Sequence, residues 1–279
     1  MFKRLKKMKD MLWALGIGLA ILALSIGLVA ASFLSYHGDR ERPVMDLRPE
    51  KTEEAESDGE QADPIAKSTG LQPDRTLHPL AETAWADDDY LGTLTLICDS
   101  SFAALRGSGL TEASVWSSET GSLPMDSVEE WKIRYPGDGS LVSPSNAALI
   151  SKPAKLILAI GGDSSAGMRK EAFVEKYSSL IRALAKASPE SRIVCLSLCS
   201  VTGAYAGEDG MTPEKAQEIN GWIREICIST GAFYGELNST LCLHGELRAD
   251  YADGSGRALN SAGLTEFLKY LRFHSLDAQ

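Results

Sequence analysis

The chain has 279 residues, a mass of 30.0 kDa and a formal net charge of −10, which favours one large domain with additional segments. The first ten residues hold five Lys or Arg and one Asp, a charge of +4, so residues 11–279 carry −10 − 4 = −14. Binding of nucleic acid is not expected, because phosphate contacts require a basic face and no basic stripe follows residue 10.

An uncharged apolar run, residues 11–34, follows the basic end. As a helix it is long enough to cross the ~30 Å hydrocarbon core of a bilayer. The basic residues before it predict a single-pass signal anchor, with residues 1–10 in the cytoplasm and residues 35–279 outside. A cleaved signal peptide is the alternative, since Val29-Ala30-Ala31 offers small residues for cleavage.

Residues 35–87 are rich in Asp, Glu, Pro, Gly and Ser and contain few large apolar side chains. The run 50–64, EKTEEAESDGEQADP, cannot bury enough surface to offset the entropy of ordering it. The composition therefore predicts a disordered acidic linker. An acidic tail that binds a partner is the alternative.

From residue 88 onward, short apolar runs alternate with helical patterns, which indicates βαβ units and a parallel sheet. Residues 88–279 are therefore predicted to form one doubly wound α/β domain with a five-stranded parallel sheet. Strands are expected at 94–98, 113–116, 156–160, 193–198 and 233–237, and helices from about 100 and at 144–151, 169–187, 212–230 and 261–274.

The five cysteines include no Cys-x-x-Cys pair, and the four histidines are scattered, so a metal site is not expected. Most of the cysteines are expected to be small buried residues. Cys195 and Cys199 are expected on one strand, about 13 Å apart and too far for a disulfide.

Ligands of doubly wound sheets bind where the strands end. The residues after the expected strands are Asp99-Ser100, Gly161-Gly162-Asp163, Val201-Thr202, Asn238-Ser239 and Asp253-Gly254. The stretch 161–167, GGDSSAG, fits neither phosphate-binding glycine pattern, so no cofactor is expected.

The order of these motifs resembles the SGNH hydrolases, also called the GDSL family of esterases and acyl hydrolases. Over residues 91–275 the chain looks closest to the bacterial extracytoplasmic members, whose fold is a flavodoxin-like three-layer domain. The resemblance implies that Ser100, after Asp99, is the nucleophile. It further implies that Gly121 and Gly161 belong to the oxyanion site and that Asp163 stands where the family has an oxyanion-binding Asn. An ionised Asp accepts hydrogen bonds and would repel an oxyanion.

The family's last block, Asp-x-x-His, resembles the segment that starts at Asp253 and ends in Leu259-Asn260. Counting forward from Asp253 places the family's base at Gly256, and counting back from Asn260 places it at Ala258. Neither is histidine. His244, upstream in the same region, is the candidate substitute, and the alternative is an exposed loop histidine.

Each candidate also has a structural interpretation. Ser100 can be a helix N-cap residue, and Asp163 and Asp253 can be turn residues. Trp116, Trp131 and Trp222 can line a sugar-binding face or belong to the core.

Two hypotheses follow. The first is a degenerate SGNH domain that binds a cell-envelope glycan, lipid or protein without hydrolysing esters. The second is an active envelope ester hydrolase, in which Ser100 is the nucleophile, Asp253 keeps its triad role and His244 or a water relay is the base.

Overall fold

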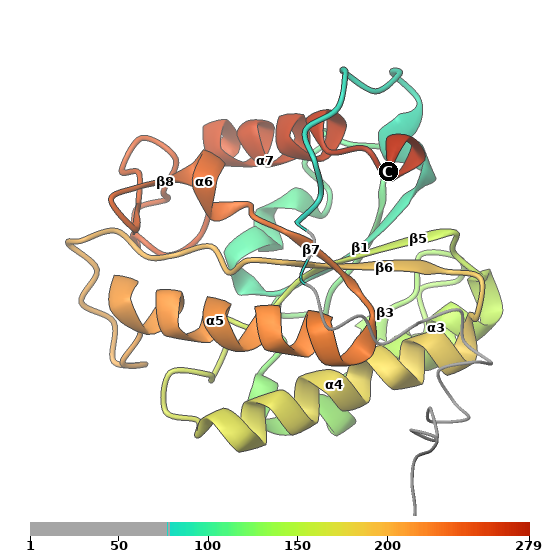
Figure 1. Cartoon of the computed structure of the whole chain (residues 1–279), viewed down its shortest axis with the longest axis horizontal. Coiled ribbons are helices and arrows are strands. Elements are labelled where there is room, and N and C mark those ends of the chain that lie inside the picture. Colours follow the sequence, from blue (N-terminus) through green and yellow to red (C-terminus); the bar gives the residue numbers. More distant parts are fainter. Residues whose placement is uncertain (1–76, 78) are drawn as a thin grey trace, which may run out of the picture. The chain divides into compact units, whose positions relative to one another are not determined.

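The structure is a computed structural model that describes residue 77 and residues 79–279 (Figure 1). The predicted basic end (residues 1–10), the predicted membrane helix (residues 11–34) and most of the predicted linker lie outside the described residues. None of the helices within 79–279 combines the length with the hydropathy that a membrane span requires.

A five-stranded parallel sheet forms the centre of the domain. Its strands are β1 (Leu94–Cys98), β2 (Ser114–Trp116), β5 (Lys155–Ala159), β6 (Arg192–Leu196) and β7 (Phe233–Gly235). Their order across the sheet is β2-β1-β5-β6-β7, so the chain reverses direction of travel at β1. This is the flavodoxin-like order, and it confirms the predicted α/β domain with five parallel strands.

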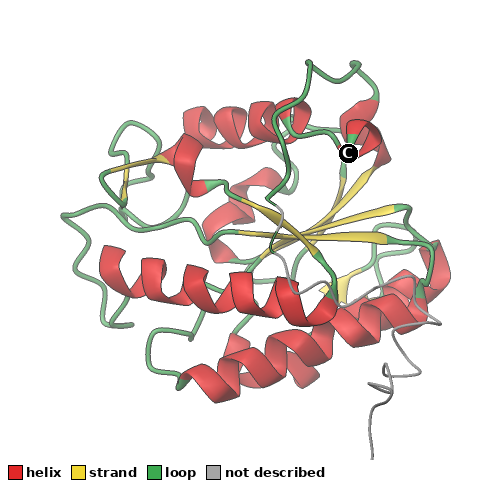
Figure 2. Cartoon of the chain, viewed as in Figure 1, coloured by secondary structure: helices red, strands yellow, loops and turns green. Residues whose placement is uncertain are grey.

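Helices cover both faces of the sheet (Figure 2). The helices α3 (Pro144–Ser151), α4 (Lys170–Ala187) and α5 (Pro213–Thr230) lie on one face, and α7 (Ser261–Phe273) lies on the other (Figure 1). Short elements complete the described part: η1 (Tyr90–Thr93), η2 (Ser100–Leu105), η3 (Met125–Glu130), α6 (Asn238–Leu241), η4 (Leu276–Ala278), and the strand pairs β3 (Ile133–Arg134) with β4 (Leu141–Val142) and β8 (Cys242–Leu243) with β9 (Glu246–Leu247).

Successive residues of a strand pack into two separate hydrophobic cores, one on each face of the sheet, because side chains alternate across a strand. In β1, Leu94, Leu96 and Cys98 pack toward α7, whereas Ile97 packs toward α4 and α5. Every residue of β1 is buried. The unbroken apolar run of this strand is therefore the pattern of a sheet covered on both faces.

The helix boundaries follow from local chemistry. The Thr212 hydroxyl accepts a hydrogen bond from the Lys215 N–H at the start of α5, and Pro213 occupies the first turn. Gly231 ends the helix with φ of 75°, a left-handed conformation that favours glycine. The predicted start and stop of this helix are both confirmed.

The start of the domain differs from the predicted boundary, since residues 79–87 pack on the domain rather than belonging to a disordered linker. Leu80 is buried, and its N–H donates to the Tyr234 carbonyl at 2.7 Å. Thr83 and Ala86 donate backbone hydrogen bonds to the end of α7. Two apolar side chains of the segment also contact the domain: Leu80 belongs to the core on the α7 side, and the Trp85 ring packs edge-on against Phe273 with ring centroids 5.1 Å apart.

Three other expectations are decided by the structure. The strand β6 ends at Leu196, so Cys199 lies beyond it and the prediction that Cys195 and Cys199 share a strand is wrong. The five cysteines are free thiols, and four are buried, as expected. Trp116, Trp131 and Trp222 are 1–5% exposed, so they belong to the core and not to a sugar-binding face.

Candidate active site

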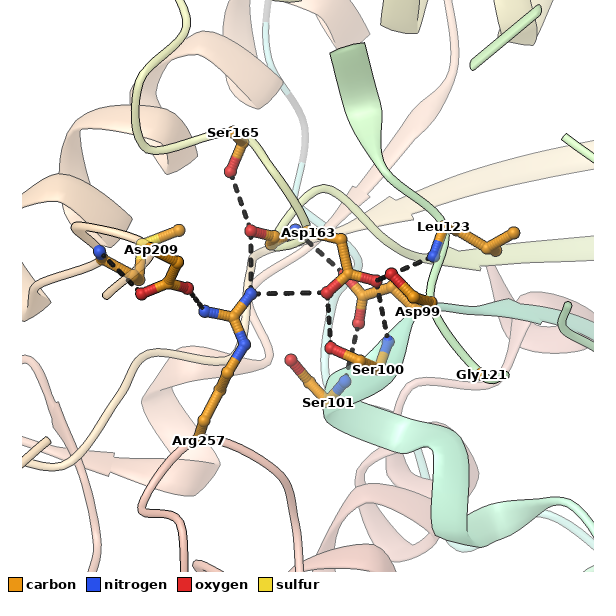
Figure 3. A network of polar contacts seen from close by, with 12 residues as sticks. Asp99, Ser100, Ser101, Gly121, Leu123, Asp163, Ser165, Asp209 and Arg257 are labelled. Carbon is orange, nitrogen blue, oxygen red and sulfur yellow. Dashed lines mark hydrogen bonds and ion pairs between the residues drawn. The ribbon is translucent and has the colours of Figure 1, made fainter. Parts of the chain in front are cut away.

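The candidate site lies where β1 and β5 end side by side (Figure 3). Asp99 and Ser100 follow β1, and Asp163 follows β5. Cys98, the last residue of β1, pairs with Ala159, the last residue of β5, so the two following loops start at the same level of the sheet. The resemblance placed Ser100 and Asp163 in one site, and the structure brings them into direct contact.

The Asp163 carboxylate is the most heavily bonded group of the site. Its Oδ1 accepts the Ser100 hydroxyl, and its Oδ2 accepts the Ser100 N–H at 3.2 Å. The same Oδ2 accepts the Ser122 hydroxyl at 2.9 Å and the Leu123 N–H at 2.8 Å. Asp163 is 5% exposed, so these donors replace the water that the charge would otherwise require.

The guanidinium of Arg257 is shared between this carboxylate and Asp209. Its Nη2 donates to the Gly162 carbonyl at 3.0 Å and lies 3.4 Å from Asp163 Oδ1, while its Nη1 contacts Asp209 (Figure 3). Burial acts to lower the pKa of Arg257, but Asp209 and Asp163 raise it above its usual value. Arg257 therefore stays protonated between the Asp163 and Asp209 carboxylates.

A second buried carboxylate, Asp99, holds together the two loops that form the site. It accepts the Ser101 N–H at 3.0 Å and the Gly162 N–H at 2.9 Å, so it ties the loop after β1 to the loop after β5. Burial, followed by the charge of Asp163, raises the pKa of Asp99 to about 7. Asp99 also caps the short 3-10 helix η2, which begins at Ser100, where the sequence predicts the start of a helix.

The two glycines assigned to an oxyanion site have structural tasks in this chain. Gly121 has φ of 85°, its N–H donates to Ser118, and an added Cβ would lie 2.7 Å from the Cβ of Ala103. Gly161 has φ of 116° and faces Leu198 at the end of the core. The backbone N–H that points into the site on the Gly121 side is that of Leu123.

Asp253 lies in an exposed turn. Its carboxylate accepts hydrogen bonds from the N–H and the hydroxyl of Ser255. Its backbone N–H donates to Ala258, and the turn closes before Asn260, which caps α7. Among the residues that the structure describes, no histidine bonds to Asp253, and the contacts of this carboxylate are those of a turn residue.

His244 occupies the two-residue turn between β8 and β9, is exposed, and has φ of 55°. With Thr202 and Glu246 it lines a cavity of about 730 Å³. The other described histidine, His274, bonds to the Tyr270 carbonyl at the end of α7. Neither is among the hydrogen-bond partners of Ser100 in the described part of the chain.

Three residues that bond to Asp163 were not expected from the sequence: Ser122, Leu123 and Arg257. Leu123 contributes a backbone N–H, for which a side chain gives no signal. Arg257 had a signal, because it lies between Gly256 and Ala258, the two positions that counting from Asp253 and Asn260 gives for the base. The structure shows an arginine reaching the site from that point of the loop.

No protein-family model and no curated protein matches the chain. Among solved structures it is similar to a candidate GDSL-like lipase from Parabacteroides merdae ATCC 43184, with 12% identity, 70% of this chain and 97% of that chain covered, and a TM-score of 0.43. It is also similar to a candidate acylhydrolase from Bacteroides fragilis NCTC 9343, with 11% identity, coverage of 77% and 96%, and a TM-score of 0.42.

A third similar structure is described as a candidate platelet activating factor from Streptococcus pneumonia, with 16% identity, coverage of 74% and 88%, and a TM-score of 0.41. One of these solved structures is thus named for a GDSL-like lipase and another for an acylhydrolase, and the motif order of the chain resembles the GDSL family. Identities of 11–16% leave the chemistry to be decided by the chain's own residues.

Proposed function

We propose that residues 79–279 form an SGNH-hydrolase-like domain that binds a ligand without turning it over efficiently. The observation that carries this proposal is the double contact of Asp163 with the hydroxyl and the N–H of Ser100. One carboxylate holds both the group that would attack an ester and a donor that would stabilise the resulting oxyanion. Ser100 is therefore present, but both its hydroxyl and its N–H are already hydrogen-bonded to Asp163.

Two requirements of serine catalysis are affected. A serine hydroxyl needs a base that takes its proton and later returns it to the leaving group, a task suited to histidine. An oxyanion needs unoccupied donors, and here the Ser100 and Leu123 N–H groups already bond to a negative charge. Losses of this kind reduce serine hydrolase rates by roughly 10³–10⁶.

The second candidate function is an active ester hydrolase with a carboxylate base. The favouring observation is again the hydrogen bond from the Ser100 hydroxyl to Asp163 Oδ1, the contact that a base would make. Ser100 Oγ would then attack the ester carbonyl and lose its proton to Asp163, which would pass that proton to the departing alcohol as the ester C–O bond breaks. The acyl group would remain on Ser100 until water released it.

Hydrolysis of p-nitrophenyl acetate by residues 79–279 separates the two functions, with Ser100→Ala as the matched control. Binding without turnover gives the same rate for both proteins. A rate that falls at least tenfold in Ser100→Ala supports the hydrolase. A further loss in Asp163→Asn then identifies Asp163 as the base.

We further propose that residues 11–34 anchor the chain in a membrane, with the N-terminus in the cytoplasm and the α/β domain outside. The support is the uncharged run after five basic residues. In that position the domain would meet the molecules of the cell envelope, so we propose a glycan, lipid or protein of the envelope as its ligand. Protease treatment of spheroplasts, in which the outer face of the inner membrane is accessible, tests this, since digestion of the domain is expected and its full protection would contradict the orientation.

A further inference from the structure

Four donor groups surround the Asp163 carboxylate, and we call them the anion cradle: the Ser100 N–H, the Ser122 hydroxyl, the Leu123 N–H and the Arg257 guanidinium. They come from three segments that are distant in the sequence, after β1, after β2 and before α7 (Figure 3). We infer that the anion cradle is a binding site for a small carboxylate, which the protein fills with its own Asp163.

The distribution of donors matches a carboxylate in both shape and charge. Three of them converge on Oδ2, at distances of 2.8–3.2 Å, while Arg257 approaches Oδ1 together with the Ser100 hydroxyl. Both oxygens of a planar anion are thus engaged from separate directions. Arg257 supplies the compensating charge, and a guanidinium suits planar oxyanions well.

Two of the four donors, the Leu123 N–H and the Arg257 guanidinium, belong to residues with anchors other than Asp163. The Leu123 side chain is 1% exposed and belongs to the core. Arg257 stays tied to Asp209 and to the Gly162 carbonyl. We expect these anchors to keep both donors in place after the carboxylate is removed, when the buried Leu123 N–H would lose its acceptor.

A tethered carboxylate excludes free anions from the cradle, because its effective concentration is far above theirs. The inference rests on the proposed function in one respect, namely that these donors are not used in turnover. It also narrows the class of ligand in the proposed function. The natural ligand of the domain would have to bind without placing an anionic group in the anion cradle.

Removal of the carboxylate tests the inference. Asp163→Ala lacks one carboxylate group and leaves space for formate, and Asp163→Gly leaves space for acetate. We expect sodium formate to raise the melting temperature of Asp163→Ala saturably by several degrees over sodium chloride at equal ionic strength, as mass action requires of a ligand that binds the folded state. Wild-type protein and the exposed control Asp253→Ala are expected to respond equally to both salts.

A second variant identifies the site of the effect. Adding Ser122→Ala to Asp163→Ala removes one cradle donor, and we expect the formate affinity to fall roughly tenfold, the change typical of one lost hydrogen bond. If Asp163→Ala does not fold in chloride, the recovered folded fraction is measured against formate instead. Equal behaviour in formate and chloride, in either format, would overturn the inference.

The inference and the proposed function fail separately. Formate binding by Asp163→Ala together with Ser100-dependent ester hydrolysis by the wild-type protein would leave the cradle standing and refute binding without turnover. No formate effect and no hydrolysis would refute the cradle alone.

Discussion

Two regions of the site differ in how well their sequence predicts their structure. The first region is the pair of loops after β1 and β5, and the second is the loop before α7. At the first place, Asp99, Ser100 and Asp163 occupy the positions that the motif order predicts and meet in one buried network. At the second, Asp253 and Asn260 frame the expected segment, but Arg257 is the residue that reaches the site. A motif can therefore keep its flanking residues and its place in the fold, while the side chain that it brings to the site is an arginine in place of the expected base.

The largest expected effect concerns the first region. Asp163→Ala removes a buried carboxylate with five donors, and we expect a loss of about 3–5 kcal/mol in the free energy of unfolding, as for other broken buried ion pairs. Urea unfolding measures it. Asp253→Ala, which removes an exposed carboxylate, should cost less than about 1 kcal/mol. Equal losses in the two variants would contradict the contrast between the regions.

The pH dependence of stability sharpens the comparison. Because the pKa of Asp99 is about 7 in the folded state and near 3.8 when unfolded, the folded state holds more protons between these values. Its contribution to stability is therefore largest below pH 4 and falls as the pH rises to 7, by a few kcal/mol at about 1.4 kcal/mol per pKa unit.

Asp253 has the opposite sign. Partial burial acts to raise its pKa, but the hydrogen bonds of Ser255 hold the pKa below its usual range, so its smaller contribution is lost only as the pH falls. Urea titrations from pH 4.5 to 7.5 are expected to show a weaker decline in Asp99→Asn than in the wild-type protein. An unchanged slope would mean that Asp99 ionises normally.

A medium effect is expected at the end of the second region. The Asn260 side chain accepts the N–H groups of Ala262 and Gly263 at 2.9 and 3.0 Å and donates to the Asp250 and Ala252 carbonyls. Asn260→Ala should destabilise the domain by about 1–2 kcal/mol in urea unfolding. The control Ser143→Ala, which removes one cap bond of 3.3 Å from α3, should cost less.

The smallest effect belongs to His244. It is exposed and has φ of 55°, a conformation that glycine adopts more easily. His244→Gly should change the free energy of unfolding by at most about 0.5 kcal/mol and leave any ester hydrolysis unaltered. Loss of Ser100-dependent hydrolysis in this variant would restore His244 as the base.

Most of the fold was predictable from local signals. The strand Leu94–Cys98 and the helices Pro144–Ser151 and Pro213–Thr230 agree with the expected ranges, because apolar periodicity and capping residues act over a few positions. The linker was predicted too long, since composition cannot show that Leu80 would find a place beside Tyr234.

The site was predictable in part, for a related reason. Ser100 and Asp163 follow neighbouring strands, so topology alone brings them together. The contact between Arg257 and Gly162 joins residues 95 positions apart and depends on where a glycine-rich loop folds back, which no local pattern records. The five donors of Asp163 likewise include two backbone groups that the sequence does not reveal.

The central claim is that Ser100, hydrogen-bonded to Asp163, is not an activated nucleophile. A fluorophosphonate that reacts with activated serines tests it most directly. Residues 79–279 and the Ser100→Ala control are incubated with the probe, and the mass of each intact protein is measured. We expect no adduct on either protein, because neither His244 nor His274, the two histidines of residues 79–279, bonds to the hydroxyl and the neighbouring donors are occupied. A stoichiometric adduct on the wild-type protein that Ser100→Ala lacks would show an activated nucleophile and contradict binding without turnover.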